Sequence, residues 1–325
     1  MAQEPSLRKL GRSELRVTPI GLGCWQFSGR KNIPGKFWPL LSQEQIQEII
    51  SVSLKGGVNW FDTAEAYGGG ESEINLSRSL KRLGINPGDV YIATKWTPML
   101  RTAATIHKTI GERLDCLDGF GIDIHQVHNP FYLSSTRSVM TAMAELVKMG
   151  RIRYIGVSNF SAKRMRKAHA ELRQFGLELV SNQVKYSLLA RKIESNGVLD
   201  TAKELGISII AYSPLSQGVL SGKFHDQPAL LRGLKGFRKF MPEFWKKNLE
   251  KSRPVVEALK ELAEKYQVST SQVALNWVLY TQGASVVAIP GATKAEQARE
   301  DAAAMRFRLN DDELDHLNTV SVGFK

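Results

Sequence analysis

Eight short apolar runs, separated by segments of helical periodicity, are the feature that most constrains how this chain can fold. Their lengths are typical of buried strands, and they lie near residues 18–23, 58–62, 90–95, 122–128, 153–157, 178–183, 208–212 and 285–289. Strands that alternate with helices indicate a parallel sheet with helical crossovers. No linker separates the eight units. We therefore expect residues 1–325 to form a single α/β domain, a closed (β/α)8 TIM barrel.

The segments between and after these runs predict the helical layer and three additions to it. Helices are expected near 42–56, 71–82, 102–116, 134–149, 161–175, 197–205, 253–281 (in two pieces) and 295–304. A β-hairpin is expected at about 7–17. A Gly-, Arg- and Lys-rich insertion at about 222–252 follows the seventh strand, and its length is typical of a functional lid. A C-terminal helix is expected at about 310–320, where acidic residues occupy the first turn.

The composition narrows the class of protein. Cys24 and Cys116 are the two cysteines; they form no disulfide framework, and their spacing fits no metal motif. No run approaches about 18 apolar residues, and the first residues lack the apolar stretch of a signal peptide, so we expect a cytoplasmic protein without a membrane partner. The net charge of +12 can attract anions, but no nucleic-acid-binding pattern accompanies it.

Four ionisable side chains stand where three of the apolar runs end. Asp62 and Tyr67 follow the second run, Lys95 ends the third, and His128 ends the fourth. In an α/β barrel the chemistry lies at the C-terminal ends of the strands. A tyrosine, with a pKa of about 10, holds a proton at neutral pH, and a neighbouring cation such as Lys95 lowers that pKa. This set is suited to protonating a carbonyl oxygen while hydride arrives at the carbon.

Asp62 and Tyr67 also have simpler structural interpretations. Asp62 is placed to cap the following turn, and Tyr67 precedes three glycines as a loop aromatic would. His125 competes with His128, but on a strand the two side chains point to opposite faces, which argues against a shared metal. We expect His125 to face the helices.

A dinucleotide-binding Rossmann domain is a poor match. Gly21-Leu-Gly23 begins like its glycine fingerprint, but Gln26 stands where the last glycine belongs, and the segment continues into a proline-containing loop.

Seven motifs, in order along the chain, resemble the aldo-keto reductase family. They are Trp60-Phe-Asp-Thr-Ala-Glu-Ala-Tyr-Gly, Ala93-Thr-Lys, Gln126-Val-His-Asn-Pro, Gly156-Val-Ser-Asn-Phe, Asn182-Gln-Val, Ala211-Tyr-Ser-Pro-Leu and Ile289-Pro-Gly-Ala. The similarity spans about residues 17–304 and is to bacterial and plant-type members and to the potassium-channel β-subunit branch. It implies a TIM barrel, a nicotinamide cofactor across the barrel mouth, and Asp62, Tyr67, Lys95 and His128 as the catalytic tetrad.

The resemblance also implies a cofactor site and a reaction. The matching positions are Cys24, Trp25, Asp62, Ser158, Asn159, Gln183, Tyr212, Ser213, Pro214, Leu215, Gln217, Gly218, Lys223, Gly291, Ala292, Thr293, Lys294, Gln297, Glu300 and Asp301. Asp301 stands where the family usually has Asn. An Asn side chain can donate a hydrogen bond to the adenine ring, but an ionised carboxylate cannot. Lys294, with Arg232 or Arg238 from the lid, is expected to contact a 2′-phosphate, so NADPH is favoured over NADH. The reaction implied is the metal-free reduction of a small aldehyde or ketone to an alcohol.

The substrate pocket is expected to include Trp25, Trp96, Asn129 and Phe131, which follow strands on the active face. Two other functions stay open at this point. One is a redox-sensing or regulatory subunit that binds NADPH and turns over slowly. The other is a binder of nucleic acid or an anionic surface through the basic face, which the charge alone does not support. The oligomeric state is not readable from the sequence.

Overall fold

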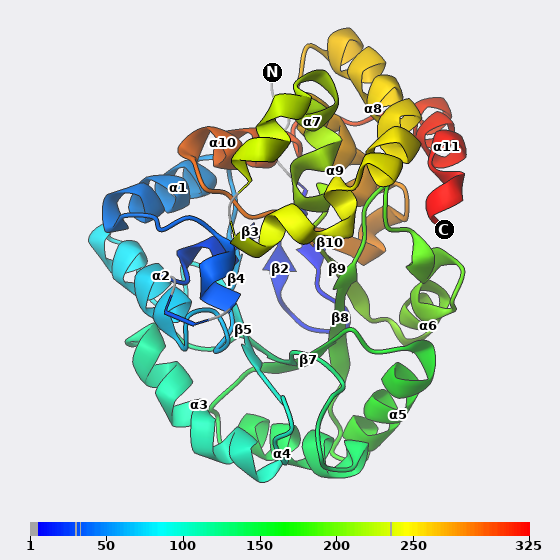
Figure 1. Cartoon of the computed structure of the whole chain (residues 1–325). Coiled ribbons are helices and arrows are strands. Elements are labelled where there is room, and N and C mark those ends of the chain that lie inside the picture. The colour runs from blue at the N-terminus through cyan, green and yellow to red at the C-terminus, as the bar shows by residue number, and fades with distance from the viewer. Residues whose placement is uncertain (1–5, 30, 33, 235) are drawn as a thin grey trace.

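Eight parallel strands surround the centre of the molecule in the computed structural model, which describes residues 6–29, 31–32, 34–234 and 236–325 (Figure 1). They are β3 (Leu22–Gly23), β4 (Trp60–Asp62), β5 (Tyr91–Trp96), β6 (Ile124–Val127), β7 (Tyr154–Ser158), β8 (Leu179–Lys185), β9 (Ser208–Tyr212) and β10 (Val286–Ile289). Each pairs with the next along the chain. Isolated bridges from Ile20 to Ala288 and from Gly23 to Gly291 bring the first and last strands together. The predicted barrel is confirmed.

The helices form a ring outside the strands (Figure 1). They are α1 (Gln43–Lys55), α2 (Glu71–Arg82), α3 (Ala104–Leu117), α4 (Thr136–Lys148), α5 (Ala162–Arg173), α6 (Val198–Leu205), α9 (Thr270–Tyr280) and α10 (Ala295–Ala303). Helix α1 shows why the local sequence folds this way. Ser42 and Gln45 form a reciprocal capping box at its start, and Ile46, Ile49 and Ile50 bury one face against the barrel.

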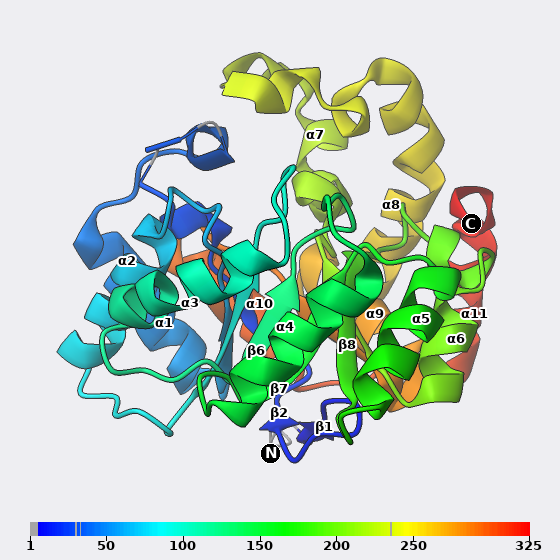
Figure 2. The ribbon, with the colours of Figure 1, turned by 90° about the horizontal axis from the view of Figure 1, so that it is seen from below.

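The two ends of the barrel differ (Figure 2). At one end, β1 (Arg8–Lys9) and β2 (Arg16–Val17) form the predicted antiparallel hairpin, and Leu10 and Leu15 join the cluster of apolar side chains inside the barrel. At the opposite end, the segments that follow the strands project together with the lid. The first five residues, on which the expectation about a signal peptide partly rests, lie outside the described residues. None of the helices described is long and apolar enough to cross a membrane.

The lid is more helical than the sequence predicted. It contains α7 (Lys223–Asp226) and short 3-10 turns, and then α8 (Lys246–Tyr266) begins inside the segment expected to be a loop. The prediction that the helix starts near residue 253 was wrong. Leu249, Ser252 and Val256 are buried at helical spacing, so the apolar face of α8 extends back past Pro254.

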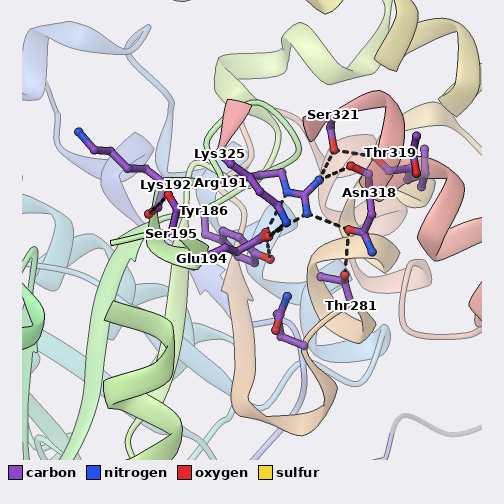
Figure 3. A network of polar contacts seen from close by, with 12 residues as sticks. Tyr186, Arg191, Lys192, Glu194, Ser195, Thr281, Asn318, Thr319, Ser321 and Lys325 are labelled. Atoms are coloured by element: carbon purple, nitrogen blue, oxygen red, sulfur yellow. Dashed lines mark hydrogen bonds and ion pairs between the residues drawn. The ribbon is translucent and has the colours of Figure 1, made fainter. Parts of the chain in front are cut away.

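The C-terminal helix α11 (Asp311–Val320) is held against the segment that follows β8. Arg191, almost fully buried, donates from Nη1 to the Ser321 hydroxyl at 2.7 Å and to the Asn318 carbonyl at 2.6 Å. Its charge is balanced by Glu194, which lies 2.8 Å away and also contacts Lys325 (Figure 3). The network fixes the last residues of the chain beside the segment that follows β8.

Candidate active site

The four predicted side chains of the tetrad meet at the C-terminal end of the barrel. Asp62 is the last residue of β4, Lys95 lies near the end of β5, and His128 directly follows β6. These strands are neighbours in the sheet, which brings the three ends together. Tyr67 reaches the same place from the turn after β4, and its ring lies 5.7 Å from that of His128 in an edge-on arrangement.

Lys95 and Asp62 form a buried ion pair. Their exposed fractions are 0% and 1%, and the lysine ammonium donates to Asp62 Oδ1 and, at 2.8 Å, to the Thr63 carbonyl. The other carboxylate oxygen accepts from Gln126 Nε2 at 2.9 Å and from Gln183 Nε2 at 2.7 Å. Burial lowers the pKa of Lys95, but the charge of Asp62 and the contact with Tyr67 outweigh it and raise the pKa above its usual value. Lys95 is therefore charged at neutral pH.

Tyr67 lies directly beside this pair. Lys95 Nζ is 3.5 Å from the phenol oxygen and 5.0 Å from the ring centroid. The Trp25 ring stacks on that of Tyr67, with ring centroids 5.8 Å apart. Burial raises the pKa of Tyr67 and the charge of Lys95 lowers it, and burial is the stronger effect. The predicted lowering by Lys95 is therefore present but outweighed, and Tyr67 keeps its proton at neutral pH and is able to donate it.

His128 is a neutral imidazole. Burial, together with the charge of Lys95, lowers its pKa to about 3. Its Nδ1 lies 3.3 Å from the Thr97 hydroxyl oxygen. His125 points the other way, as expected, and its pKa is also lowered to about 3 by burial and by Arg113 of α3. The two histidines do not share a site. No group of three or more His, Cys, Asp or Glu side chains within the described ranges is placed to hold a metal ion.

A cavity of about 740 Å³ opens beside the tetrad. It is lined by most of the residues that the sequence placed at the cofactor: Cys24, Trp25, Asp62, Ser158, Asn159, Gln183, Tyr212, Ser213, Pro214, Leu215, Gln217, Gly218, Lys223, Gly291, Thr293, Gln297, Glu300 and Asp301. Three predicted positions are not among the lining residues. Ala292 is buried, while Lys294 and Arg232 are exposed. Lys294 is the N-cap residue of α10. The structure thus brings residues from Cys24 to Asp301 into one cavity.

The segment after β9 has an unusual backbone. Ser213, Ser216 and Gln217 have positive φ values of 50°, 46° and 59°, and Gly218 follows at 86°. L-residues adopt this left-handed region infrequently, and two backbone hydrogen bonds hold the segment in this shape: Ser216 N–H donates to the Ser213 carbonyl and Gly218 N–H to the Leu215 carbonyl, both at 2.9 Å. In the sequence, Gly218 indicated a left-handed backbone position, but nothing indicated positive φ values at the three non-glycine residues.

Cations border this backbone segment. Lys223 lines the cavity, and its pKa is lowered by burial and by the charges of Arg238 and Lys294. Arg238 reaches over from the lid, donates to the Gln217 carbonyl at 3.1 Å, and lies 4.7 Å from the Trp38 ring. Of the two lid arginines considered, Arg238 therefore lines the cavity and Arg232 does not. Mutually repelling cations at one place favour an anionic ligand.

The far end of the cavity contains a buried acid. Asp301 is 5% exposed, and its pKa is raised well above the usual value by burial and by the charge of Glu300. The site therefore favours the protonated form of Asp301, and a protonated carboxyl group offers a donor as well as an acceptor, whereas an ionised carboxylate offers acceptors only.

The expected substrate residues divide into two groups. Trp25 and Asn129 line the cavity. Trp96 is fully buried away from it and donates to Thr105 Oγ1 at 3.1 Å, and Phe131 is 69% exposed on the surface. Trp96 and Phe131 are therefore outside the cavity, because alternation along β5 and the course of the loop after β6 turn them away. Trp38, Met99 and Met241 line it instead.

Sequence reasoning also missed the role of Gln126. It lies two residues before His128, and side chains two apart on a strand share a face. A polar residue at an inward position was the available signal. Trp38 and Met241 lie in irregular segments, where no periodicity indicates direction.

The chain is similar to known proteins over most of its length. The sequence model described as "Aldo/keto reductase family" matches residues 19–321. The aldo-keto reductase str7 of Strobilurus tenacellus is 32% identical over 94% of this chain and 89% of its own length. The glycerol dehydrogenase structure from Gluconobacter oxydans has a TM-score of 0.82 at 26% identity, covering 98% of this chain and 96% of that one. An aldo-keto reductase from Klebsiella pneumoniae, solved with NADPH, has a TM-score of 0.73 at 22% identity, covering 98% and 96%.

Proposed function

This chain belongs to the Aldo/keto reductase family of oxidoreductases, and we propose that it reduces aldehydes or ketones to alcohols, reversibly, with NADPH as the hydride source and Tyr67 as the general acid. The observation that carries the proposal is the position of Lys95. Its ammonium group contacts both the Asp62 carboxylate and the Tyr67 phenol, so the proposed acid Tyr67 lies beside a buried cation whose charge Asp62 balances.

The residues around the cavity fit a dinucleotide with phosphates. Lys223 and Arg238, beside the left-handed segment 213–218, are suited to a pyrophosphate, and Lys294 is suited to a 2′-phosphate nearby. Ser158, Asn159 and Gln183 supply hydroxyl and amide groups beside the tetrad for a carboxamide, and Tyr212 offers an aromatic face. The NADPH complex of the Klebsiella pneumoniae protein, which shares the fold, supports this choice of cofactor.

The side chains of the tetrad supply and control the proton that the carbonyl oxygen receives. NADPH, when bound, supplies hydride to the carbonyl carbon. Tyr67 donates its phenolic proton to the carbonyl oxygen, and Lys95 stabilises the phenolate that remains. Asp62 balances Lys95, with Gln126 and Gln183 holding the carboxylate in place. His128, being neutral, is able to donate an N–H to the same oxygen.

A panel of aldehydes and ketones, followed by NADPH absorbance and repeated with NADH, tests the proposal. We expect steady turnover on some carbonyl compounds, a lower Michaelis constant for NADPH than for NADH, and unchanged activity after prolonged EDTA treatment. Tight NADPH binding with slow exchange and no turnover on any compound would favour the regulatory subunit instead. Equal use of both cofactors would contradict the NADPH assignment.

A further inference from the structure

Thr97, the residue after β5, contacts the catalytic histidine from outside the tetrad. Its hydroxyl oxygen lies 3.3 Å from His128 Nδ1, and Thr97 also lines the cavity. Among the residues the structure describes, neither this hydroxyl nor this ring nitrogen has another hydrogen-bond partner. Within the described residues, the hydrogen bond between Thr97 and His128 is therefore the contact that influences whether Nδ1 carries a proton.

The backbone of Thr97 is clamped so that its side chain keeps this position. Glu65, 8% exposed, accepts the Thr97 N–H with Oε1. Arg101 donates to the same carboxylate oxygen at 2.6 Å and to the Thr97 carbonyl at 2.9 Å. Glu65 belongs to the turn that also carries Tyr67. One turn therefore positions both the phenol and the threonine, and the partly buried ion pair between Arg101 and Glu65 holds the loop in this arrangement.

The tautomer of His128 decides whether it is able to act on a carbonyl. A neutral imidazole carries its proton on one nitrogen only. If Nδ1 carries it, Thr97 accepts, and Nε2 presents a lone pair that repels the substrate oxygen. If Thr97 donates to Nδ1, then Nε2 carries the proton and is a donor. Building on the proposed carbonyl reduction, we propose that Thr97 is a positioning residue that donates to Nδ1 and thereby keeps His128 as the Nε2–H tautomer.

The tautomer is measurable without any turnover. ¹⁵N-imidazole NMR of the His-labelled enzyme with NADP⁺, with His128 assigned through the His128→Gln variant, distinguishes a protonated from an unprotonated Nδ1. We expect the wild type to show unprotonated Nδ1 and protonated Nε2. In Thr97→Val, which keeps the branched shape and loses the hydroxyl, we expect a mixture of tautomers. Thr97→Ser keeps the hydroxyl and should retain the wild-type spectrum.

Kinetics of the same pair of variants provide the second measurement. We expect Thr97→Val to lower kcat about fivefold, equivalent to roughly 1 kcal/mol, the net contribution of one hydrogen bond. The Michaelis constant for NADPH should not change, and Thr97→Ser should restore kcat. A protonated Nδ1 in the wild type, an unchanged spectrum in Thr97→Val, or equal loss of kcat in both variants would overturn the proposal. Absence of carbonyl reduction by the wild type would instead contradict the proposed function and leave the NMR test valid.

Discussion

The two ends of the cavity differ in how the charges of their side chains are balanced. At the tetrad, Lys95 is buried against Asp62, whose second oxygen accepts two further hydrogen bonds. At the lid, Lys223 and Arg238 have no carboxylate partner among the described residues. Burial lowers the pKa of both side chains, and the positive charges of Arg238 and Lys294 lower the pKa of Lys223 further. The comparison teaches that the charges at the first end balance each other, whereas the positive charges at the second end are left without a carboxylate partner within the described residues.

The balance at the tetrad also supports Tyr67 as the proposed proton donor. Lys95 keeps its proton because of Asp62, and His128 is neutral because of burial and Lys95. Tyr67 is the group that both holds a proton at neutral pH and faces the cavity beside a cation able to stabilise its anion. At the lid, by contrast, no proton transfer is expected, and substitutions there should change binding more than chemistry.

The largest expected effect is at the acid. Tyr67→Phe keeps the ring that stacks on Trp25 and removes the proton, so carbonyl reduction should fall by about 10²–10⁴-fold. NADPH affinity, measured by fluorescence titration, should stay near the wild-type value. Near-normal turnover in this variant would refute the role of Tyr67 and remove the distinction between the two ends.

Breaking the ion pair should reduce stability as well as activity. Lys95→Met leaves Asp62 buried without its cation, and loss of one partner of a buried pair costs about 3–5 kcal/mol. We expect inactivity and a lower Tm by thermal denaturation. The matched control is the double variant Asp62→Asn/Lys95→Met, in which no charge is left unpaired. It should be equally inactive but more stable than Lys95→Met; equal stability of the two would show that the pair is not balanced as described.

The lid cations should affect binding. Lys223→Met and Arg238→Met each remove a charge at the cavity wall, and a charge-assisted hydrogen bond contributes about 1.5–3 kcal/mol. The Michaelis constant for NADPH should therefore rise roughly tenfold to hundredfold while kcat at saturation changes little. Arg232→Ala, exposed and outside the cavity, is the control and should leave both constants unchanged. A kcat effect larger than the binding effect would contradict the division of roles.

Lys294 tests the choice between the two cofactors. Because it is exposed, its contact with a 2′-phosphate is screened by solvent, and we expect Lys294→Ala to raise the Michaelis constant for NADPH by about tenfold or less. The constant for NADH should be almost unchanged. Steady-state kinetics with both cofactors measure this, and an equal effect on each would mean that Lys294 does not recognise the phosphate.

Asp301 should show the smallest effect, and it depends on pH. Its folded-state pKa is raised, so the folded protein binds this proton more tightly than the unfolded chain does, and stability is lost as pH rises above about 4. Asp301→Asn removes that loss. We expect a gain on the order of 1 kcal/mol at pH 7 by urea denaturation and no difference below about pH 4. A gain that persists at low pH would contradict a titrating carboxyl group.

The sequence by itself determined the barrel, because strand and helix periodicities are local and repeat eight times. It also placed Asp62, Lys95 and His128 at strand ends, since parallel strands in a barrel end on the same face. Helix starts followed from capping residues: Ser42 and Asn310 begin α1 and α11 as expected. The start of α8 was missed because its buried face continues into a segment rich in Gly, Arg and Lys.

Only the tertiary structure decided what each of these side chains touches. Whether the pKa of Tyr67 is raised or lowered depends on two opposing effects, burial beside Trp25 and the barrel wall and the charge of Lys95. Their relative size depends on distances that no local sequence pattern encodes. The removal of Trp96 from the cavity and the arrival of Arg238 in it depend on how irregular segments pack across the barrel mouth. Periodicity specifies a face of an element, but contacts between loops arise from the packing of residues far apart in the chain, which is why those positions could not be read in advance.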